Sequence, residues 1–273
     1  MTPPNPNPHP QSQIPETREE EEVKGGNSRF NAEAQSWDSN PSVQRATELA
    51  HEAYLSHLLL TASASTVATY DVLEIGCGTG LLSLRLAPVV RSLTAVDAAE
   101  GMISVLRTKL SSSSSSQKIK KILPVAAMLT SPDDPRIQID PLTRNSATEE
   151  NRRRFDLVIS HLVLHHIADL ESLFKMIYGC LKPGGRVMVT DFEDFGPAAR
   201  RFHPEAKMEG VERHGIQRGA MRELLVGSGF REVRVETAFE MEKAVERVPG
   251  GGVVAGEGGE TMVFPFLICE GTR

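Results

Sequence analysis

The chain has 273 residues and a mass of 29.8 kDa, enough to bury a sizeable core in one large domain. Its composition, 40% hydrophobic and 24% charged, is that of a globular protein, and it contains no run of about 18 apolar residues that could span a membrane. The net charge of -6 excludes an overall positive field, so we expect no nucleic-acid partner.

The cysteines and the first residues bear on the compartment. Cys77, Cys180 and Cys269 are odd in number and widely spaced, which fits neither a disulfide framework nor a zinc cluster. The first residues lack the apolar stretch of a secretory signal and the basic amphipathic pattern of a mitochondrial one. We therefore expect a reducing compartment and a cytoplasmic protein, with the nucleus as an alternative.

The chain begins with a segment of low apolar content. Residues 1–28 are rich in Pro, Asn and Glu and are predicted to be a disordered tail, because they cannot bury enough apolar surface to offset the entropy of ordering. One folded domain is expected over residues 29–273. It starts with one or two helices over residues 30–60, where apolar side chains recur at helical spacing.

After these helices, short apolar strands alternate with helical segments. The expected strands cover residues 71–76, 92–97, 121–127, 155–160, 185–192, 231–239 and 262–271. The expected helices cover residues 81–87, 101–110, 168–181 and 218–226, and the expected loops include 111–116, 131–154 and 250–259. The alternation predicts an α/β fold with a doubly wound, mostly parallel seven-stranded sheet and an antiparallel C-terminal edge.

The sequence VLEIGCGTG places Gly76, Gly78 and Gly80 on the turn that leaves the first expected strand. Glycine at such a turn allows a ligand to approach the backbone closely. A dinucleotide-binding fingerprint requires another glycine at position 81, where this chain has Leu81. The adjacent Glu74 also suits a cationic amino-acid sulfonium better than a pyrophosphate, because a carboxylate would repel phosphate.

Asp97 ends the second expected strand, about 20 residues after the first glycine of the turn. This spacing favours a carboxylate that accepts hydrogen bonds from both ribose hydroxyls of a bound nucleoside. The alternative is that Asp97 only caps the helix beginning near Glu100, since Asp is a common N-cap residue.

Four motifs follow one another in the chain, each at a strand end: VLEIGCGTG, AVDAAEGM, FDLVISHLVLHH and LKPGGRV. With these motifs the chain resembles the class I S-adenosylmethionine-dependent methyltransferases over residues 30–270, specifically the methyltransferase-11/12 group of mostly small-molecule enzymes. The resemblance implies a Rossmann-like fold, S-adenosyl-L-methionine as cofactor, and methylation of an O, N or C atom of a small-molecule acceptor.

The resemblance also implies a set of cofactor-binding residues. They are Glu74, Gly76, Cys77, Gly78, Gly80, Asp97, Ala98, Met102, Ala127, Met128, Ser160 and His161. The acidic residue that the family often places after the third strand is absent, so either the backbone near Ala127 and Met128 or the side chain of Asp133 would serve the adenine. Trp37 resembles the family's N-terminal cover, expected over about residues 30–60, and could equally be a core residue.

Methyl transfer is a displacement at a carbon that the sulfonium activates, so the protein mainly supplies alignment. A general base is needed only for an acceptor that arrives protonated. The candidates for it follow the fourth and fifth strands: His165, His166, Asp191, Glu193, Asp194, His203, Glu212 and His214. His203 and His214, in an expected acceptor lid over about residues 192–217, and His166 are the catalytic candidates, although packing or capping roles remain open.

No dedicated metal site is expected, because the spacing of Asp191, Glu193, His203 and His214 fits none. Aromatic and apolar lid residues could form an acceptor pocket or belong to the core: Phe192, Phe195, Phe202 and Met208. A protein or RNA methyltransferase is the alternative enzyme, and its docking surface would need the basic clusters at residues 152–155 and 198–202. A non-catalytic, cofactor-binding regulator is the third possibility.

Overall fold

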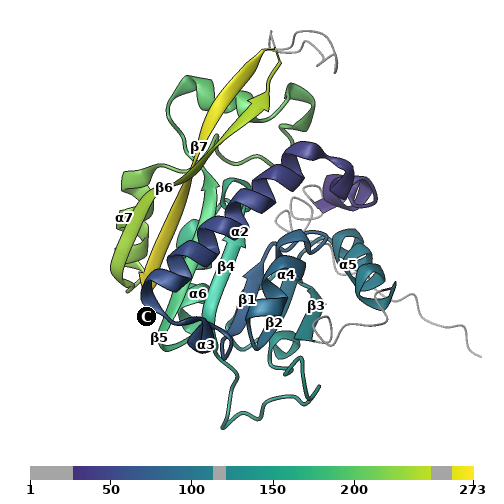
Figure 1. Ribbon diagram of the computed structural model, residues 1–273, viewed down its shortest axis with the longest axis vertical. Coiled ribbons are helices and arrows are strands. Elements are labelled where there is room, and N and C mark those ends of the chain that lie inside the picture. The colour runs from purple at the N-terminus through teal and green to yellow at the C-terminus, as the bar shows by residue number, and fades with distance from the viewer. Residues whose placement is uncertain (1–26, 113–120, 247–259) are drawn as a thin grey trace, which may run out of the picture.

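The structure, a computed structural model, describes residues 27–112, 121–246 and 260–273. Within these residues one seven-stranded sheet has the order β3-β2-β1-β4-β5-β7-β6 (Figure 1). The strands from β3 to β5 pair in parallel, whereas β7 is antiparallel to both β5 and β6. The expected disordered tail, apart from residues 27 and 28, which are helical, lies outside the described residues, as do most of the serine run and the whole loop at 250–259.

Every expected strand and every expected helix is present in the described residues. The strands are β1 (Asp71–Ile75), β2 (Ser92–Asp97), β3 (Ile122–Ala126), β4 (Phe155–His161), β5 (Leu181–Phe192), β6 (Arg231–Ala244) and β7 (Thr261–Thr272). The α-helices after residue 40 are α2 (Pro41–Thr61), α3 (Ala64–Val67), α4 (Leu81–Leu86), α5 (Glu100–Ser112), α6 (Leu170–Cys180) and α7 (Arg218–Gly227). The predicted α/β fold with a doubly wound, mostly parallel sheet and an antiparallel C-terminal edge is therefore confirmed.

Helices cover both faces of the sheet. On one face α2, α4 and α5 bury apolar side chains such as Leu58, Leu82 and Leu106 against the strands. On the other face α6 and α7 do the same with side chains such as Phe174 and Leu225. Because both faces are covered, every residue of β1 is buried, which explains why its sequence is a short continuous apolar run interrupted only by Glu74.

Helix α2 fixes the central strands near their carboxyl ends. Its N-cap residue Asn40 accepts a hydrogen bond from the backbone N–H of Ser42, and Pro41 fills the first helical position. The buried Tyr54 hydroxyl lies 2.7 Å from the carbonyl oxygen of Ser160 on β4 and 3.0 Å from Oγ1 of Thr190 on β5. The helix therefore holds β4 and β5 in register at the edge where ligands bind in open α/β sheets.

The aromatic residues after β5 mainly build core. Phe192 and Phe202 stack with their ring centroids 4.0 Å apart, and both pack with Phe264 and Phe266 of β7 in one buried cluster. Their burial favours the core role over an acceptor pocket for these two residues. Phe195 is 41% exposed instead.

No helix in the described part of the chain is long and apolar enough to cross a membrane.

Candidate functional site

The turn between β1 and α4 holds its three glycines in the left-handed region, with φ of +71° at Gly76, +53° at Gly78 and +81° at Gly80. A Cβ on Gly76 would lie 2.2 Å from Cγ2 of Val163, and one on Gly80 would lie 2.4 Å from Cδ1 of Leu106. At Gly78 the nearest atom would be 3.9 Å away. Packing therefore requires two of the glycines, whereas a Cβ on Gly78 would make only an ordinary van der Waals contact.

Asp97 ends β2 beside this turn. Its Oδ2 accepts a hydrogen bond of 2.8 Å from the backbone N–H of Gly78, and its Oδ1 accepts one of 2.8 Å from Ala99. The bond to Ala99 closes a local turn before α5 and is similar to the helix-capping role considered for Asp97. The bond to Gly78 instead joins the ends of β1 and β2. The half-buried carboxylate, next to half-buried Ala98, keeps a second lone pair on each oxygen.

Glu74 and Cys77 have buried side chains next to the glycine turn. Glu74 is 2% exposed and accepts a hydrogen bond from the Ser83 hydroxyl on α4. Burial raises the pKa of Glu74 to about 8, with the nearby Asp97 contributing in the same direction. Cys77 is a buried free thiol whose pKa is raised by burial, so its side chain belongs to the core and only its backbone lines the turn.

The residues expected around the adenine lie in different environments. Met102 is 1% exposed and packs with Ala34 and Ala99 beneath Phe30 and Trp37. The other residues expected there are Ala127, Met128 and Asp133, which follow β3. They differ in the contacts that they already make.

The backbone N–H of Ala127 donates to the carbonyl oxygen of Asp97 at 2.8 Å, and Met128 is 44% exposed. Asp133 forms ion pairs of 3.0 Å with Arg152 and 2.6 Å with Arg154. An Asp133 side chain held by two arginines is already engaged, which argues against its reaching the adenine.

The end of β4 carries Ser160 and His161. Ser160 Oγ donates to the carbonyl oxygen of Ile75 at 2.8 Å and so ties β4 to β1. His161 Nδ1 lies 2.8 Å from Thr190 Oγ1, and its Nε2 is buried with no hydrogen-bond partner. Burial lowers the pKa of His161 to about 4, so the ring is neutral at pH 7 and presents an unused nitrogen.

A three-histidine cluster, His165, His166 and His203, lies beyond the ends of β4 and β5. The ring centroids are 3.9 Å apart for His165 and His166, 4.9 Å for His165 and His203, and 5.9 Å for His166 and His203. His165 Nδ1 lies 2.9 Å from both carboxylate oxygens of buried Asp191. The fold therefore brings together two of the three catalytic candidates, His166 and His203.

His214, the third catalytic candidate, is not part of this cluster. It is half-buried, and its Nδ1 is buried with no hydrogen-bond partner. Its neighbour Arg213 donates hydrogen bonds to the carbonyl oxygens of Leu164, Ile167 and Ala168, which ties the chain before α7 to the chain before α6.

The cluster is an environment that disfavours charge on imidazole. Burial, together with the neighbouring histidines of the cluster, lowers the pKa of His166 to about 3 and that of His203 to about 2. Burial would raise the pKa of Asp191, yet His165 and two backbone N–H groups hold it below its usual range. His166 and His203 are therefore neutral at pH 7 and too weakly basic for efficient general base catalysis there.

Residues 46–235 match a family of known proteins described as a methyltransferase domain. The match extends over more than half of the chain, from α2 into β6. The chain belongs to the methyltransferase domain family. The predicted resemblance to class I S-adenosylmethionine-dependent methyltransferases is thus confirmed at the level of family.

Individual relatives agree with the family and are longer proteins. An uncharacterised methyltransferase of Schizosaccharomyces pombe is 31% identical over 148 residues, which are 53% of this chain and 47% of the relative. The mitochondrial ubiquinone biosynthesis O-methyltransferase of Mus musculus is 29% identical over 119 residues, 44% of this chain and 28% of the relative. The matches thus span about half or less of the length of these curated relatives.

A solved structure agrees with the fold. A putative methyltransferase of Bacillus halodurans superposes with a TM-score of 0.55 at 16% identity, covering 80% of this chain and 97% of that one. At this identity the likeness shows the fold alone. It confirms the Rossmann-like methyltransferase architecture of the sheet.

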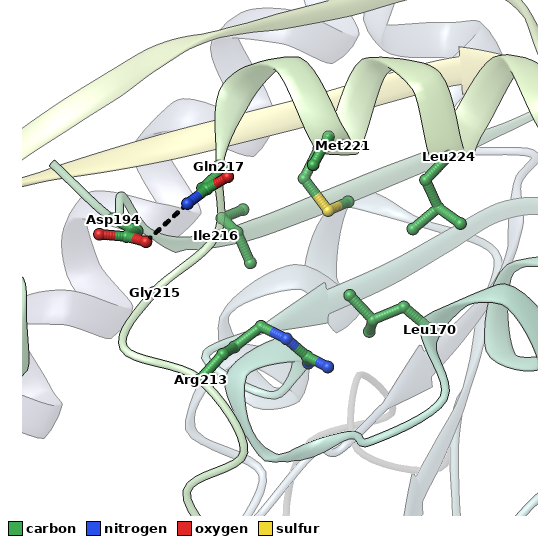
Figure 2. Close-up of a pocket in the computed structure, with 9 residues that line it drawn as sticks. Leu170, Asp194, Arg213, Gly215, Ile216, Gln217, Met221 and Leu224 are labelled. Atoms are coloured by element: carbon green, nitrogen blue, oxygen red, sulfur yellow. Dashed lines mark hydrogen bonds between the residues drawn. The ribbon is translucent and has the colours of Figure 1, made fainter. Parts of the chain in front are cut away.

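The methyltransferase domain contains a cavity of about 250 Å³ between α7, the start of α6 and the residues that follow β5. Figure 2 shows Met221 and Leu224 of α7 on one side and Leu170 of α6 opposite, with Gln217 bonded to Asp194 at 2.9 Å. Its lining residues are Leu170, Asp194, Arg213, Gly215, Ile216, Gln217, Ala220, Met221 and Leu224. No residue of the glycine turn lines it, so it is separate from the candidate cofactor site.

The N-terminal segment, residues 27–40, connects the two parts of the site through contacts that the sequence did not reveal. Asp38 accepts a hydrogen bond of 2.5 Å from Thr79 in the glycine turn, and Asn31 accepts one of 2.7 Å from the backbone N–H of Gly101. At its other end Glu33 forms an ion pair of 2.9 Å with Lys207, after β5.

The aromatic rings of this segment follow the same path. Phe30 packs edge-on against Trp37 at 5.8 Å and against His166 at 5.2 Å, measured between ring centroids. Trp37 in turn is the side chain that a Cβ on Gly78 would meet, at 3.9 Å from its Nε1. Sequence reasoning singled out only Trp37, because the partners of the other residues are tens of positions away and share no motif with them.

Proposed function

We propose that this protein is an S-adenosyl-L-methionine-dependent methyltransferase that transfers the methyl group to an O, N or C atom of a small-molecule acceptor. One observation carries the proposal. The backbone of Gly78 bonds to the Asp97 carboxylate across the carboxyl ends of β1 and β2, in a turn where a Cβ on Gly78 would meet no atom closer than 3.9 Å. Ligands of open α/β sheets bind at this edge.

The residues present fit the cofactor. Asp97 would accept hydrogen bonds from the ribose hydroxyls, using the lone pairs that Gly78 and Ala99 leave free. His161, with its buried and unpartnered Nε2, would face the methionine moiety. The bound cofactor supplies a methyl carbon already activated by its sulfonium, so the chain needs to bind, align and exclude water.

The other expected cofactor residues divide into two groups. Those that would contact the cofactor are Gly76, Cys77 and Gly80 through their backbone, with Ala98, Met102, Ala127 and Met128 toward the adenine. Glu74 and Ser160 instead hold the turn and β4 in place, since their side chains already bond to Ser83 and to the carbonyl oxygen of Ile75.

The acceptor would approach from the ends of β4 and β5. In this proposal residues 29–273 form one methyltransferase domain, residues 30–60 cover the cofactor, and residues 192–217 form the acceptor lid. His203, His214 and His166 would contact the acceptor, and the low pKa values of His166 and His203 make these two neutral hydrogen-bonding groups rather than bases. The similarity to a ubiquinone biosynthesis O-methyltransferase supports a small-molecule acceptor.

The arginines give little support to a protein or RNA substrate. Arg152 and Arg154 pair with Asp133, ahead of β4, while Arg200 pairs with Glu205 and Arg201 with Glu260, after β5. The two clusters thus flank opposite ends of the strands and do not surround one cleft. Paired arginines also offer less charge to a phosphate backbone than unpaired ones.

Calorimetric titration with S-adenosylmethionine tests the cofactor assignment. We expect the wild type to bind, Asp97→Ala to bind on the order of 100-fold more weakly because hydrogen bonds to a charged group contribute about 1.5 to 3 kcal/mol, and Asp133→Ala to bind like the wild type. A wild type that does not bind would overturn the proposed function.

Incubation of the protein with methyl-labelled cofactor and a cell extract then tests the acceptor. Label in the small-molecule fraction supports the proposal, whereas label in protein or RNA would favour the alternative enzyme. Intact binding with no labelled product in any fraction would favour a non-catalytic regulator.

A further inference from the structure

The three-histidine cluster is more compact than ordinary packing of imidazoles requires. One ring nitrogen from each of His165, His166 and His203 can be chosen so that all three lie within 4.8 Å of one another. Two of these residues stand on the short 3-10 helix η5 (Leu164–His166), and the third follows η6 (Pro197–Phe202), so the grouping depends on the tertiary fold.

Hydrogen bonds orient two of the rings in the manner of metal ligands. His165 Nδ1 lies 2.9 Å from Asp191, and His166 Nδ1 lies 2.6 Å from the carbonyl oxygen of Gly210. A ring whose Nδ1–H donates to a carboxylate or carbonyl presents the lone pair of Nε2, which is the usual arrangement of metal-bound histidine. In keeping with this, Nε2 of His165 is buried and has no hydrogen-bond partner.

His203 completes the group without such a partner. No hydrogen bond to its ring joins it to any other described residue, and it borders a cavity of about 70 Å³ together with Arg200, Arg201 and Glu246. A cavity of that size can hold about two water molecules, which each occupy about 30 Å³ in the liquid. His203 is therefore the member of the cluster that borders this cavity.

Asp191 is the buried carboxylate behind the cluster. Asp191 is 0% exposed, and among the described residues its partners are His165 and backbone N–H groups, with no Lys or Arg bonded to it. Arg29 and Lys243 lie near the cluster and donate to the carbonyl oxygens of Lys207 and Phe202 rather than to Asp191. Arg200 and Arg201, which border the same cavity as His203, pair with Glu205 and Glu260. A divalent ion on the imidazoles would offset the buried carboxylate through His165.

We propose that His165, His166 and His203 bind a divalent transition metal of the zinc class. Three imidazole nitrogens are a ligand set that Zn²⁺ uses when it keeps a fourth, open position, here facing the cavity beside His203. Asp191 and the carbonyl of Gly210 act as positioning groups for two of the ligands. The inference concerns metal binding only and does not depend on the proposed methyl transfer, but it assigns His166 and His203 to the metal in place of the direct acceptor contact proposed above.

The test is a titration of the full-length chain, freed of any histidine tag and treated with chelator, with Zn²⁺ alone. We expect one strong site per chain in the wild type, and affinity at least about 100-fold lower in His203→Gln, which removes one of three ligands. Asp191→Asn should lose about 10- to 100-fold, because it removes only the orienting partner. Co²⁺ substitution should give the absorption bands of a tetrahedral site in the wild type but not in His203→Gln.

Control variants keep the result independent of folding and of the cofactor. His51→Gln changes a half-buried histidine of α2 outside the cluster and should bind Zn²⁺ like the wild type. Circular dichroism verifies the fold of each variant, and calorimetry with S-adenosylmethionine is run separately, so failure of the cofactor assignment would not be mistaken for failure of the metal site. Equal Zn²⁺ affinity in the wild type and folded His203→Gln, or no strong site in the wild type, would overturn the proposal.

Discussion

The carboxyl edge of the sheet has two halves that are built in different ways. The half at β1 and β2 consists of a glycine turn and Asp97, which are close in sequence and are joined by a backbone hydrogen bond from Gly78. The half at β4 and β5 consists of His165, His166 and His203, with Asp191 behind them and the N-terminal Phe30 in contact with His166.

This difference shows how the domain divides its tasks. The first half would recognise a common cofactor with backbone atoms and one carboxylate, which tolerate few substitutions because the turn is conformationally fixed. The second half uses side chains from distant segments, which can change without disturbing the sheet. Substitutions in the first half should therefore lower both the stability and the cofactor affinity. Substitutions in the second half should change the stability and leave the cofactor affinity nearly unchanged.

The largest effect is expected from Gly76→Ala in the glycine turn. The new Cβ would lie 2.2 Å from Val163 Cγ2 at a φ of +71°, and the branched Val163 side chain has little freedom to move away. We expect a loss of about 2 to 5 kcal/mol in the free energy of unfolding, measured by urea denaturation.

Gly78→Ala is the matched control, because its Cβ would meet no atom within 3.9 Å. It should cost only about 1 to 2 kcal/mol, from its positive φ, while weakening cofactor binding. Equal losses of stability in the two variants would contradict the distinction between packing glycines and the open one.

Next in size is the pH dependence that buried Glu74 imposes on the same half. The pKa of Glu74 is about 8 in the folded protein, against 4.5 for an unperturbed glutamate. Between pH 4.5 and pH 8 the folded state therefore keeps a proton that the unfolded state has lost. This contribution to stability is complete below pH 4.5 and is lost as the pH rises through 8. Relative to wild type, Glu74→Gln should gain about 2 to 4 kcal/mol between pH 5 and pH 9.

Urea denaturation of both proteins across this pH range measures the difference between their free energies of unfolding. Groups that titrate alike in both proteins cancel in that difference. Parallel curves for wild type and Glu74→Gln would show that the pKa of Glu74 is not raised.

A smaller effect is expected from Arg213→Ala in the second half. Its guanidinium donates to the carbonyl oxygens of Leu164, Ile167 and Ala168, next to the histidine cluster. Removing these bonds should cost about 1.5 to 3 kcal/mol of unfolding free energy and leave S-adenosylmethionine affinity within about twofold of wild type.

Arg222→Ala serves as the control, because the exposed Arg222 donates to one carbonyl oxygen, that of Val233. It should change stability by no more than about 0.5 to 1 kcal/mol. A large fall in cofactor affinity in Arg213→Ala would show that the halves are coupled more tightly than proposed.

The smallest effect on stability is expected from Lys207→Ala, at the link between the halves. Its ion pair of 2.9 Å with Glu33 is partly exposed, so its loss should cost no more than about 1 kcal/mol. Hydrogen exchange of residues 27–39 should nevertheless become faster, because this pair helps hold the segment against the chain after β5. Lys175→Ala, which breaks an exposed pair within α6, should leave that exchange unchanged.

The strands and helices could be predicted from the sequence because each is specified locally. The run DVLEI is short, carries the apolar residues Val72, Leu73 and Ile75 and is followed by glycine, and it is β1. The run SLTAVD ends in the acidic residue that the turn uses, and it is β2. Where the prediction erred, long-range pairing decided the outcome: β6 continues to Ala244 because β7 pairs with it up to Thr261.

The sequence by itself determined the half of the site that is local. A G-x-G-x-G turn and an acidic residue at the next strand end are close along the chain, so their spacing is visible before folding. Only the tertiary structure decided the other half. Parallel strands bring their carboxyl ends together, so η5, the residues after β5 and the N-terminal segment meet although up to 178 positions separate bonded partners such as Arg29 and Lys207. Side-chain contacts at that separation leave no periodicity in the sequence, because they depend on the order of the strands in the sheet.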